Sequence, residues 1–165
     1  MTEPPAELEA LLEAVCASGV ECIVVGGVAA VLHGAPTTTF DLDLVHDRSG
    51  ANLERLESLL DALEARVRDP AGRDLLPERA ALASDGQLQL TTRLGPLDLL
   101  GTLHDGRGFP ELLPHTAVLR DGDLAVRVLD LPTLIDVKSH TGRARDRLLV
   151  PLLLALAEER RRESH

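Results

Sequence analysis

The sequence predicts an α/β (α+β) fold in which helices flank a small mixed β-sheet. Short apolar runs alternate with amphipathic helical segments in the first hundred residues, and this mixture is typical of sheets covered by helices. The second half contains a hairpin signal at Asp121-Gly122 and closes with helical segments. The length of 165 residues fits a single domain. Within this single domain of residues 1–165 we expect a core at about 20–128 and a C-terminal helical part at about 131–163.

The first elements follow from periodicity and glycine placement. Ala6–Ala17 carries leucines and a valine at helical spacing and predicts a helix. The apolar run Val20–Val25 is short enough for a buried strand, and Gly27–His33 is a brief helix closed by Gly34. Phe40–His46 alternates apolar and polar residues with a period of two, so it predicts the second strand.

The remaining elements are predicted in the same way. Asn52–Arg68 repeats leucines between charged residues and predicts an amphipathic helix, whereas 69–86 is rich in breakers and is interpreted as loop with room for one helical turn. Gly95-Pro96 separates two strand-like runs, which predicts a hairpin. In order, the expected segments are strands Gln87–Thr92 and Leu97–Leu100, a loop Asp105–Pro114, strands Ala117–Arg120 and Leu124–Val128, a helix from Leu131 to about His140, and a closing helix Arg143–Arg162.

Composition excludes several classes of function. Hydrophobic residues make up 44% but aromatic residues only 1%, so the core must be aliphatic and base-stacking platforms are disfavoured. A net charge of −10 disfavours a large nonspecific nucleic-acid surface. Cys16 and Cys22 match no metal-ligand spacing and are interpreted as core residues in a reducing cytoplasm. The acidic N-terminus predicts no signal peptide, and the longest apolar run is too short to span a membrane, so we expect a cytoplasmic protein.

Two aspartates carry the strongest chemical signal. Strand periodicity places Asp41 and Asp43 on one face, where like charges about 5–7 Å apart repel by roughly 1 kcal/mol or more. The usual compensation is a hard divalent cation, and Mg²⁺ bound by carboxylates and substrate phosphates suits such a pair. Upstream, Gly26-Gly27 lies at a strand-to-helix turn, where the backbone approaches a ligand closely and a phosphate is favoured. Asp98, an acid within an apolar strand, is either an exposed edge residue or a third ligand.

With Gly26-Gly27, Asp41-Leu42-Asp43 and Asp98 in this order, the sequence resembles nucleotidyltransferases of the DNA polymerase β-like superfamily. The closer resemblance is to small bacterial AbiEii/MenT-like proteins, which include toxins of toxin–antitoxin systems, and it covers about residues 20–150. The residues that carry it are Gly26-Gly27-Val28-Ala29, Gly34, Thr39, Lys138 and the segment Arg143-Ala144-Arg145-Asp146.

The resemblance implies transfer of a nucleoside monophosphate from an NTP such as ATP to a tRNA or protein acceptor. Asp41 and Asp43 would bind two Mg²⁺ ions, and Asp98 would complete the second metal site and help deprotonate the attacking hydroxyl. The nucleotide-binding residues implied by the resemblance are Gly26, Gly27, Thr39, Lys138 and Arg143. A toxin role would also imply an antitoxin partner, and the resemblance implies no membrane partner.

One departure from the family pattern leaves alternatives open. Members of this group often carry an arginine two residues before the threonine, and Thr37 stands at that position here. The guanidinium is either lost or supplied by Arg143, Arg145 or Lys138. Lys138 also fits an ordinary exposed helix lysine, and Arg143 a surface ion pair with Asp146. The alternatives to a tRNA- or protein-modifying enzyme are a catalytically degenerate nucleotide-binding or regulatory protein and an antibiotic nucleotidyltransferase.

Overall fold

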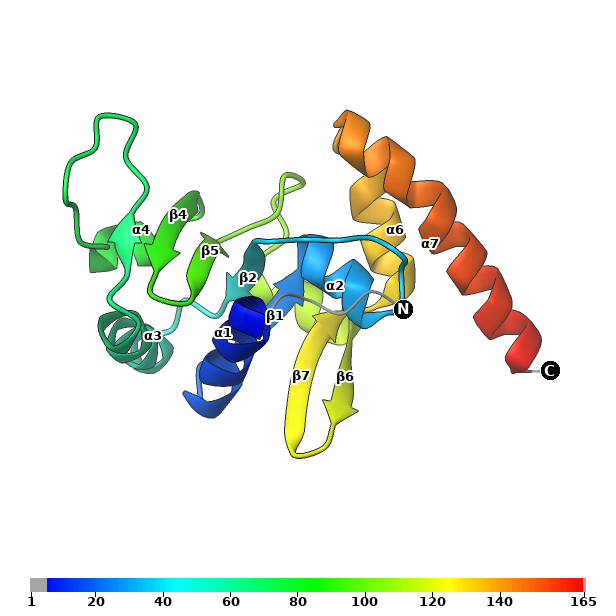
Figure 1. Cartoon of the computed structure of the whole chain (residues 1–165), viewed down its shortest axis with the longest axis horizontal. Helices are drawn as coiled ribbons and strands as arrows, with labels where there is room; N and C mark the ends of the chain where they lie inside the picture. Colours follow the sequence, from blue (N-terminus) through cyan, green and yellow to red (C-terminus); the bar gives the residue numbers. More distant parts are fainter. Residues whose placement is uncertain (1–5, 165) are drawn as a thin grey trace.

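A computed structural model describes residues 6–164, and its centre is a seven-stranded mixed sheet of order β3-β4-β5-β2-β1-β7-β6 (Figure 1). The antiparallel neighbours are β1 with β2, β3 with β4, β4 with β5 and β6 with β7, whereas β5 and β7 run parallel to β2 and β1. The sheet therefore has the predicted mixed character. The strands are β1 (Cys22–Val25), β2 (Leu42–His46), β3 (Arg66–Val67), β4 (Gln87–Thr92), β5 (Gly95–Leu100), β6 (Thr116–Asp121) and β7 (Leu124–Leu129).

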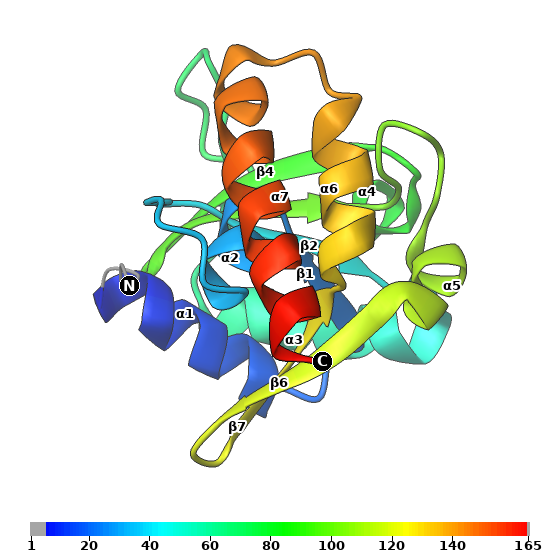
Figure 2. The ribbon, with the colours of Figure 1, turned by 90° about the vertical axis from the view of Figure 1, so that its right-hand side faces the viewer.

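Helices surround this sheet, and the last two pack against each other at one end of the molecule (Figures 1 and 2). Between β1 and β2, α2 contacts both of these strands, and it also contacts α6. None of the helices described in residues 6–164 is both long and apolar enough to cross a membrane. The helices are α1 (Ala6–Ala17), α2 (Gly26–Leu32), α3 (Gly50–Ala62), α4 (Arg79–Ala83), α5 (Phe109–Leu112), the 3₁₀ helix η1 (Leu113–His115), α6 (Leu131–Ser139) and α7 (Ala144–Glu163).

The register of three neighbouring strands brings the sequence motifs together. Val25, the last residue of β1, pairs with Asp43 on antiparallel β2. Asp43 in turn pairs with Asp98 on parallel β5. Because Gly26 follows Val25 directly, the glycine turn and two of the predicted acids lie side by side across the middle of the sheet.

The core is aliphatic, as the composition predicts. Leucines and valines fill it, with residues such as Leu44, Leu97 and Leu134 fully inaccessible to solvent. Of the two phenylalanines, Phe109 is buried while Phe40 is 69% exposed. Burial of each leucine side chain stabilises the fold by roughly 1.5–3 kcal/mol relative to exposure. The core is thus almost entirely aliphatic, with Phe109 as its one buried aromatic residue.

The predicted helix Asn52–Arg68 is wrong at its C-terminal end, because α3 stops at Ala62. Glu64 adopts a left-handed conformation with φ 54°, which turns the chain out of the helix. Arg66 then pairs with Thr91 to form the edge strand β3. Sheet pairing overrides the local helical preference here. As a result Arg68, the residue directly after β3, lies at the sheet and not on a helix.

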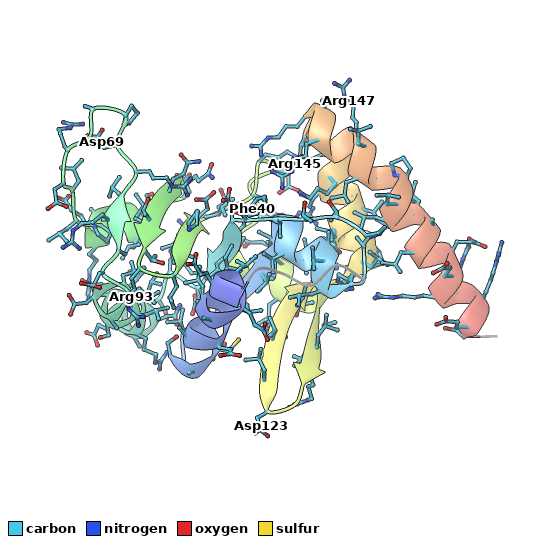
Figure 3. All side chains as sticks on the ribbon, viewed as in Figure 1. Phe40, Asp69, Arg93, Asp123, Arg145 and Arg147 are labelled. Atoms are coloured by element: carbon cyan, nitrogen blue, oxygen red, sulfur yellow. The ribbon has the colours of Figure 1, made fainter. Side chains whose placement is uncertain are left out.

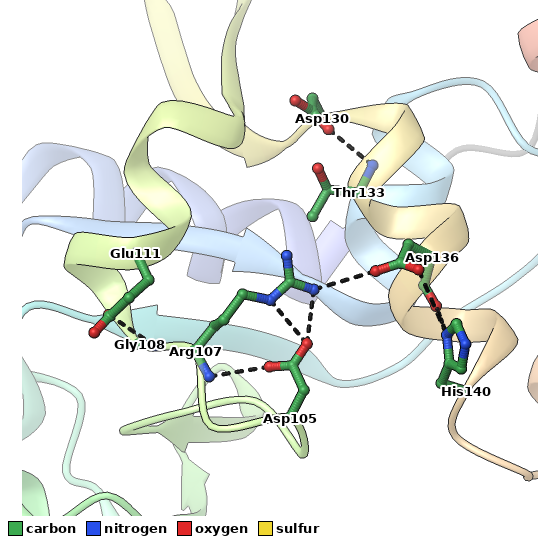
Figure 4. A network of polar contacts seen from close by, with 8 residues as sticks. All are labelled: Asp105, Arg107, Gly108, Glu111, Asp130, Thr133, Asp136 and His140. Atoms are coloured by element: carbon green, nitrogen blue, oxygen red, sulfur yellow. Dashed lines mark hydrogen bonds and ion pairs between the residues drawn. The ribbon is translucent and has the colours of Figure 1, made fainter.

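The segment Asp105–Pro114, predicted as loop, contains α5 and most of η1. The Glu111 side chain accepts a hydrogen bond from the Gly108 amide at 3.0 Å, and Phe109 is buried beneath the turn. Figure 4 shows that Arg107, just before α5, links this segment to α6, because its guanidinium contacts both Asp105 and, on α6, Asp136. Capping and tertiary ion pairs therefore build a helix that periodicity alone does not indicate.

Candidate active site

A cavity of about 550 Å³ opens between the centre of the sheet, the start of α2 and the first turns of α7. Of the residues predicted to act in catalysis or nucleotide binding, all but Gly26 line it. They are Gly27, Thr39, Asp41, Asp43, Asp98, Lys138 and Arg143. Gly26 lines an adjoining cavity of about 330 Å³, which shares Lys138 and Arg143 with the first.

Gly26 and Gly27 leave room for side chains from β2 and from the segment just before it to lie against the backbone of the glycine turn. Gly26 has φ 68°, and a Cβ at this position would overlap the Asp43 carboxylate. A Cβ on Gly27 would lie 2.7 Å from Thr39 Oγ1, closer than real Cβ atoms approach. Each glycine is thus required by a specific neighbour in the cavity.

Asp43 and Asp98 form the electrostatic centre of the site. Burial, then repulsion from Asp98, raises the pKa of Asp43 to about 7, and the Lys138 ammonium only partly offsets this. Burial also raises the pKa of Asp98, against the pull of the Arg68 guanidinium. A pair of carboxyls that resist joint ionisation is the electrostatic situation that a bound cation relieves.

Arg68 is a site residue that the sequence interpretation missed. Its guanidinium contacts the Asp98 carboxylate through Nη2, and its Nε donates to the Leu90 carbonyl at 3.2 Å. The prediction placed Arg68 on an amphipathic helix, where an arginine needs no partner. The available signal was Asp98 itself, because an acid buried in a strand requires a cation or a metal.

Lys138 and Asp146 join α6 to α7 within the cavity wall. Lys138 Nζ donates to Asp146 Oδ1 at 3.0 Å, and the Thr141 hydroxyl donates to Oδ2 at 2.5 Å. Burial opposes ionisation of Asp146, but these two hydrogen bonds, together with the charges of Lys138 and Arg143, leave its pKa below the usual value. Lys138 is therefore not an ordinary exposed lysine, and Asp146 is buried and hydrogen-bonded to Lys138 and Thr141.

Arg143 and Arg145 bring exposed guanidinium groups to the cavity from the start of α7. Neither side chain has a carboxylate partner among the ion pairs of the described residues. The Arg145 Nη2 atom lies 3.7 Å from the position that a Cβ on Gly27 would take. Figure 3 shows Arg145 on the side of α7 that faces the sheet, whereas Arg147 points away from it. Arg143 and Arg145 thus give the cavity unpaired positive charge, and Arg145 lies next to the glycine turn.

The next residues of α7 make the cavity wall apolar. Leu148 and Leu152, one helical turn apart, line the cavity while remaining 77% and 40% exposed. Leu149 lines the same wall and is buried. Gln87 and Gln89 of β4 also line the cavity. Sequence reasoning did not identify these residues, because leucines on a helix are usually core residues.

The donor set suits a hard cation. Three aspartates supply oxygen ligands of the kind that Mg²⁺ prefers, and the mutual repulsion of Asp43 and Asp98 is the strain that such an ion would relieve. Within residues 6–164, no three acidic, histidine or cysteine side chains already converge as a metal cluster. Asp41 precedes β2, which starts at Leu42, although it lines the same cavity. Asp41, Asp43 and Asp98 thus line one cavity, where they would be the residues to hold such an ion.

No protein-family model and no curated protein matches this sequence. Solved structures do match over nearly the whole chain. The lincomycin-bound lincosamide antibiotic adenylyltransferase LnuA is 13% identical, with 94% of this chain and 99% of that chain covered and a TM-score of 0.62. A candidate nucleotidyltransferase from Thermotoga maritima is 16% identical, with 90% of each chain covered and a TM-score of 0.54.

A third match is the antibiotic-resistance factor ANT(2'')-Ia, 14% identical, with 96% of this chain and 91% of that chain covered and a TM-score of 0.52. At these identities the likeness concerns the fold. The chain therefore has the nucleotidyltransferase fold, as the sequence predicts. The closer resemblance to AbiEii/MenT-like proteins stays a prediction.

Proposed function

We propose that this protein is a Mg²⁺-dependent nucleotidyltransferase that moves a nucleoside monophosphate from an NTP to an acceptor hydroxyl. The observation that carries this proposal is the register of Asp43 with Asp98 beside Gly26, in a cavity that Asp41 and Arg145 also line. Carboxylates and unpaired guanidinium groups in one cavity meet the two needs of phosphoryl transfer, which are charge neutralisation and positioning. The nucleotidyltransferase fold supports the same reaction class.

In this proposal the three aspartates hold the metal ions and handle the proton. Asp41 and Asp43 would hold two Mg²⁺ ions, and Asp98 would complete the second site. When bound, Mg²⁺ stabilises charge on the attacking and leaving oxygens of an in-line displacement. Asp98 accepts the proton of the acceptor hydroxyl, and Arg68 contacts the Asp98 carboxylate and limits its movement.

The triphosphate lies along the glycine turn and the start of α7. Gly26 and Gly27 let the phosphates approach the backbone, Thr39 offers its hydroxyl, and Arg143 and Arg145 neutralise the charge that moves onto pyrophosphate. Because Arg145 lies over Gly27, it supplies the guanidinium that Thr37 lacks. Lys138, which is paired with Asp146, also helps to neutralise this charge.

The acceptor in this proposal is a hydroxyl of tRNA or of a protein, as in a toxin that an antitoxin partner restrains. A second acceptor class is an antibiotic, in line with the names of LnuA and ANT(2'')-Ia. The net charge of −10 favours this second class over tRNA, since it disfavours a phosphate backbone along the surface.

The test incubates the protein with each α-³²P-labelled NTP, Mg²⁺, and total tRNA, cell lysate or lincomycin. We expect label on one acceptor, and none with Asp41→Ala/Asp43→Ala or with EDTA. The proposal would be refuted if no NTP binds to the protein and no NTP transfers label to an acceptor. Mg²⁺-dependent NTP binding without transfer would instead favour a catalytically degenerate nucleotide-binding protein, the alternative suggested by Thr37 at the position of the family arginine.

A further inference from the structure

The apolar surface on α7 is out of place in a cavity lined mainly by polar residues. Leu148 and Leu152 expose 77% and 40% of their surface, although both line the cavity. Apart from Val25 and Leu100 of the sheet, the aliphatic lining residues all come from α7. We call Leu148, Leu149 and Leu152 the α7 leucine wall. Large apolar side chains left open in a concave site indicate a contact surface for part of a ligand.

The position of this wall decides which substrate reaches it. Arg145 lies one turn before Leu148 or Leu149 on the same helix and reaches over Gly27, so α7 belongs to the pyrophosphate side of the site. In an in-line displacement the acceptor hydroxyl attacks from the side opposite the leaving pyrophosphate. The acceptor therefore approaches away from α7, and the nucleoside part of the donor is the group that can extend along the leucine wall.

The chemistry of the wall fits a nucleoside. The faces of a base and a ribose are weakly polar and pack against aliphatic side chains, whereas their edges need hydrogen bonds. Aromatic partners are scarce, because Phe109 is buried and Phe40 does not line the cavity. Gln87 and Gln89 add amide donors and acceptors to the same cavity.

We propose that Leu148 and Leu152 bind the nucleoside part of the donor NTP, so that one helix holds the phosphates through Arg145 and the nucleoside through its leucines. This inference rests on the proposed function, because it assumes that the triphosphate lies at Gly27 and Arg145. A flat aliphatic wall contacts any base face, and so the wall contributes affinity that is shared by all four NTPs.

The test compares NTPs with inorganic tripolyphosphate, which has the phosphates but no nucleoside. Calorimetry with Mg²⁺ gives Kd values for tripolyphosphate and for the α,β-methylene analogue of the tightest-binding NTP. The Leu148→Ser/Leu152→Ser variant should bind the NTP analogue about 10-fold more weakly, the loss expected for removing one face of two leucine contacts. Its Kd for tripolyphosphate should stay within twofold of wild type.

Two further variants serve as controls. Leu154→Ser removes a leucine that is 52% exposed on the same helix but does not line the cavity, and it should change neither Kd. Arg145→Ala should weaken both ligands together. Thermal melting checks that each variant folds, which we expect because the serine substitutions lie at exposed positions.

Three results would overturn the inference. Equal weakening of both ligands, or of neither, by Leu148→Ser/Leu152→Ser would mean that the leucines do not contact the nucleoside. A wild-type dimer that this variant converts to monomer, with the ratio of the two Kd values unchanged, would assign the leucines to an interface between copies. If wild type binds neither the analogue nor tripolyphosphate, the proposed function fails together with this inference, whereas the first two results leave the proposed function intact.

Discussion

At the scale of single residues, the site depends on atoms that are missing as much as on those present. Gly26 has no Cβ, and the Asp43 carboxylate occupies the space where one would lie. The same holds for Gly27 and Thr39 Oγ1. A Gly-Gly pair is an ordinary turn signal in sequence, but in this fold each glycine accommodates a particular side chain of the cavity.

Gly26→Ala tests this arrangement. The added methyl group must displace the Asp43 side chain, and the alanine must also adopt the left-handed φ of Gly26. We therefore expect a loss of roughly 1–3 kcal/mol in the free energy of unfolding and loss of Mg²⁺-dependent NTP binding. Gly72→Ala is the matched control, because Gly72 has a similar φ of 72° but nothing lies within 4 Å of the position that a Cβ would take. Urea unfolding should show a smaller loss for Gly72→Ala with NTP binding unchanged. Equal effects of the two substitutions would mean that only backbone strain matters.

Asp43 should destabilise the protein when no cation is bound. Its folded-state pKa of about 7 lies above the value of about 3.9 in an unfolded chain, so the folded form holds a proton between these pH values and loses stability as pH rises through them. Asp43→Asn should therefore unfold at higher urea concentration than wild type at pH 8 in EDTA, with a smaller advantage at pH 5.5. Added Mg²⁺ should stabilise wild type and not the variant. A wild type that is the more stable protein in EDTA at pH 8 would contradict this assignment.

At the scale of elements, the short edge strand β3 matters most because it ends one residue before Arg68. The Arg68 guanidinium enters from the sheet edge and contacts Asp98. Removing it leaves a buried carboxylate without its cation. The Arg68 side chain is 34% exposed, so solvent screens part of this interaction.

Arg68→Ala should lower the free energy of unfolding by about 1–3 kcal/mol, since a buried acceptor loses its partner. Asp98→Asn in the same chain should recover part of that loss, because the neutral amide needs no counter-charge. Urea denaturation of both single variants and the double variant gives the coupling energy. Additive losses would show that the two side chains do not stabilise each other.

Local signals predicted most elements, and tertiary contacts account for those they missed. The helix at Ala6–Ala17 and the strand Gln87–Thr92 have the predicted bounds, because periodicity and breakers act within a few residues. The end of α3 and the pairing of Arg66 with Thr91 depend on residues far apart in sequence. For the same reason the sequence indicated the acids and glycines of the candidate site but not Arg68 or the leucine wall.

At the scale of the whole molecule, buried histidines connect distant segments. His33 Nε2 donates to the Leu129 carbonyl at 2.8 Å, and its Nδ1 accepts from Arg160 at 3.1 Å, which ties the end of α2 to β7 and to α7. His46 Nε2 donates to the Leu82 carbonyl at 2.6 Å, which joins β2 to α4. Burial lowers the pKa of both imidazoles, so the fold favours their neutral forms.

Stability should reflect this preference as pH falls. Below about pH 6.5 the unfolded chain takes up protons that the folded protein excludes, which costs at most about 1.4 kcal/mol per pH unit for each histidine. His46→Gln should therefore lose less stability than wild type between pH 7.5 and 5.5 in urea titrations. The difference between the two proteins isolates His46 from Asp43, whose raised pKa acts in the opposite direction. Parallel pH profiles would contradict the exclusion of protons from His46.

The pairing of Asp43 with Asp98 also limits how this sheet can change by insertion. Side chains on a strand alternate between faces, so one residue added within β5 before Asp98 would turn that carboxylate to the opposite face while leaving the strand paired. Two added residues would restore the face but move the acid by about 7 Å along the strand. Insertions in the exposed segment 70–76 carry no such penalty, because this segment belongs to no strand and contributes no residue to the cavity. Length variation among functional descendants of this chain should therefore gather in 70–76 and avoid β5.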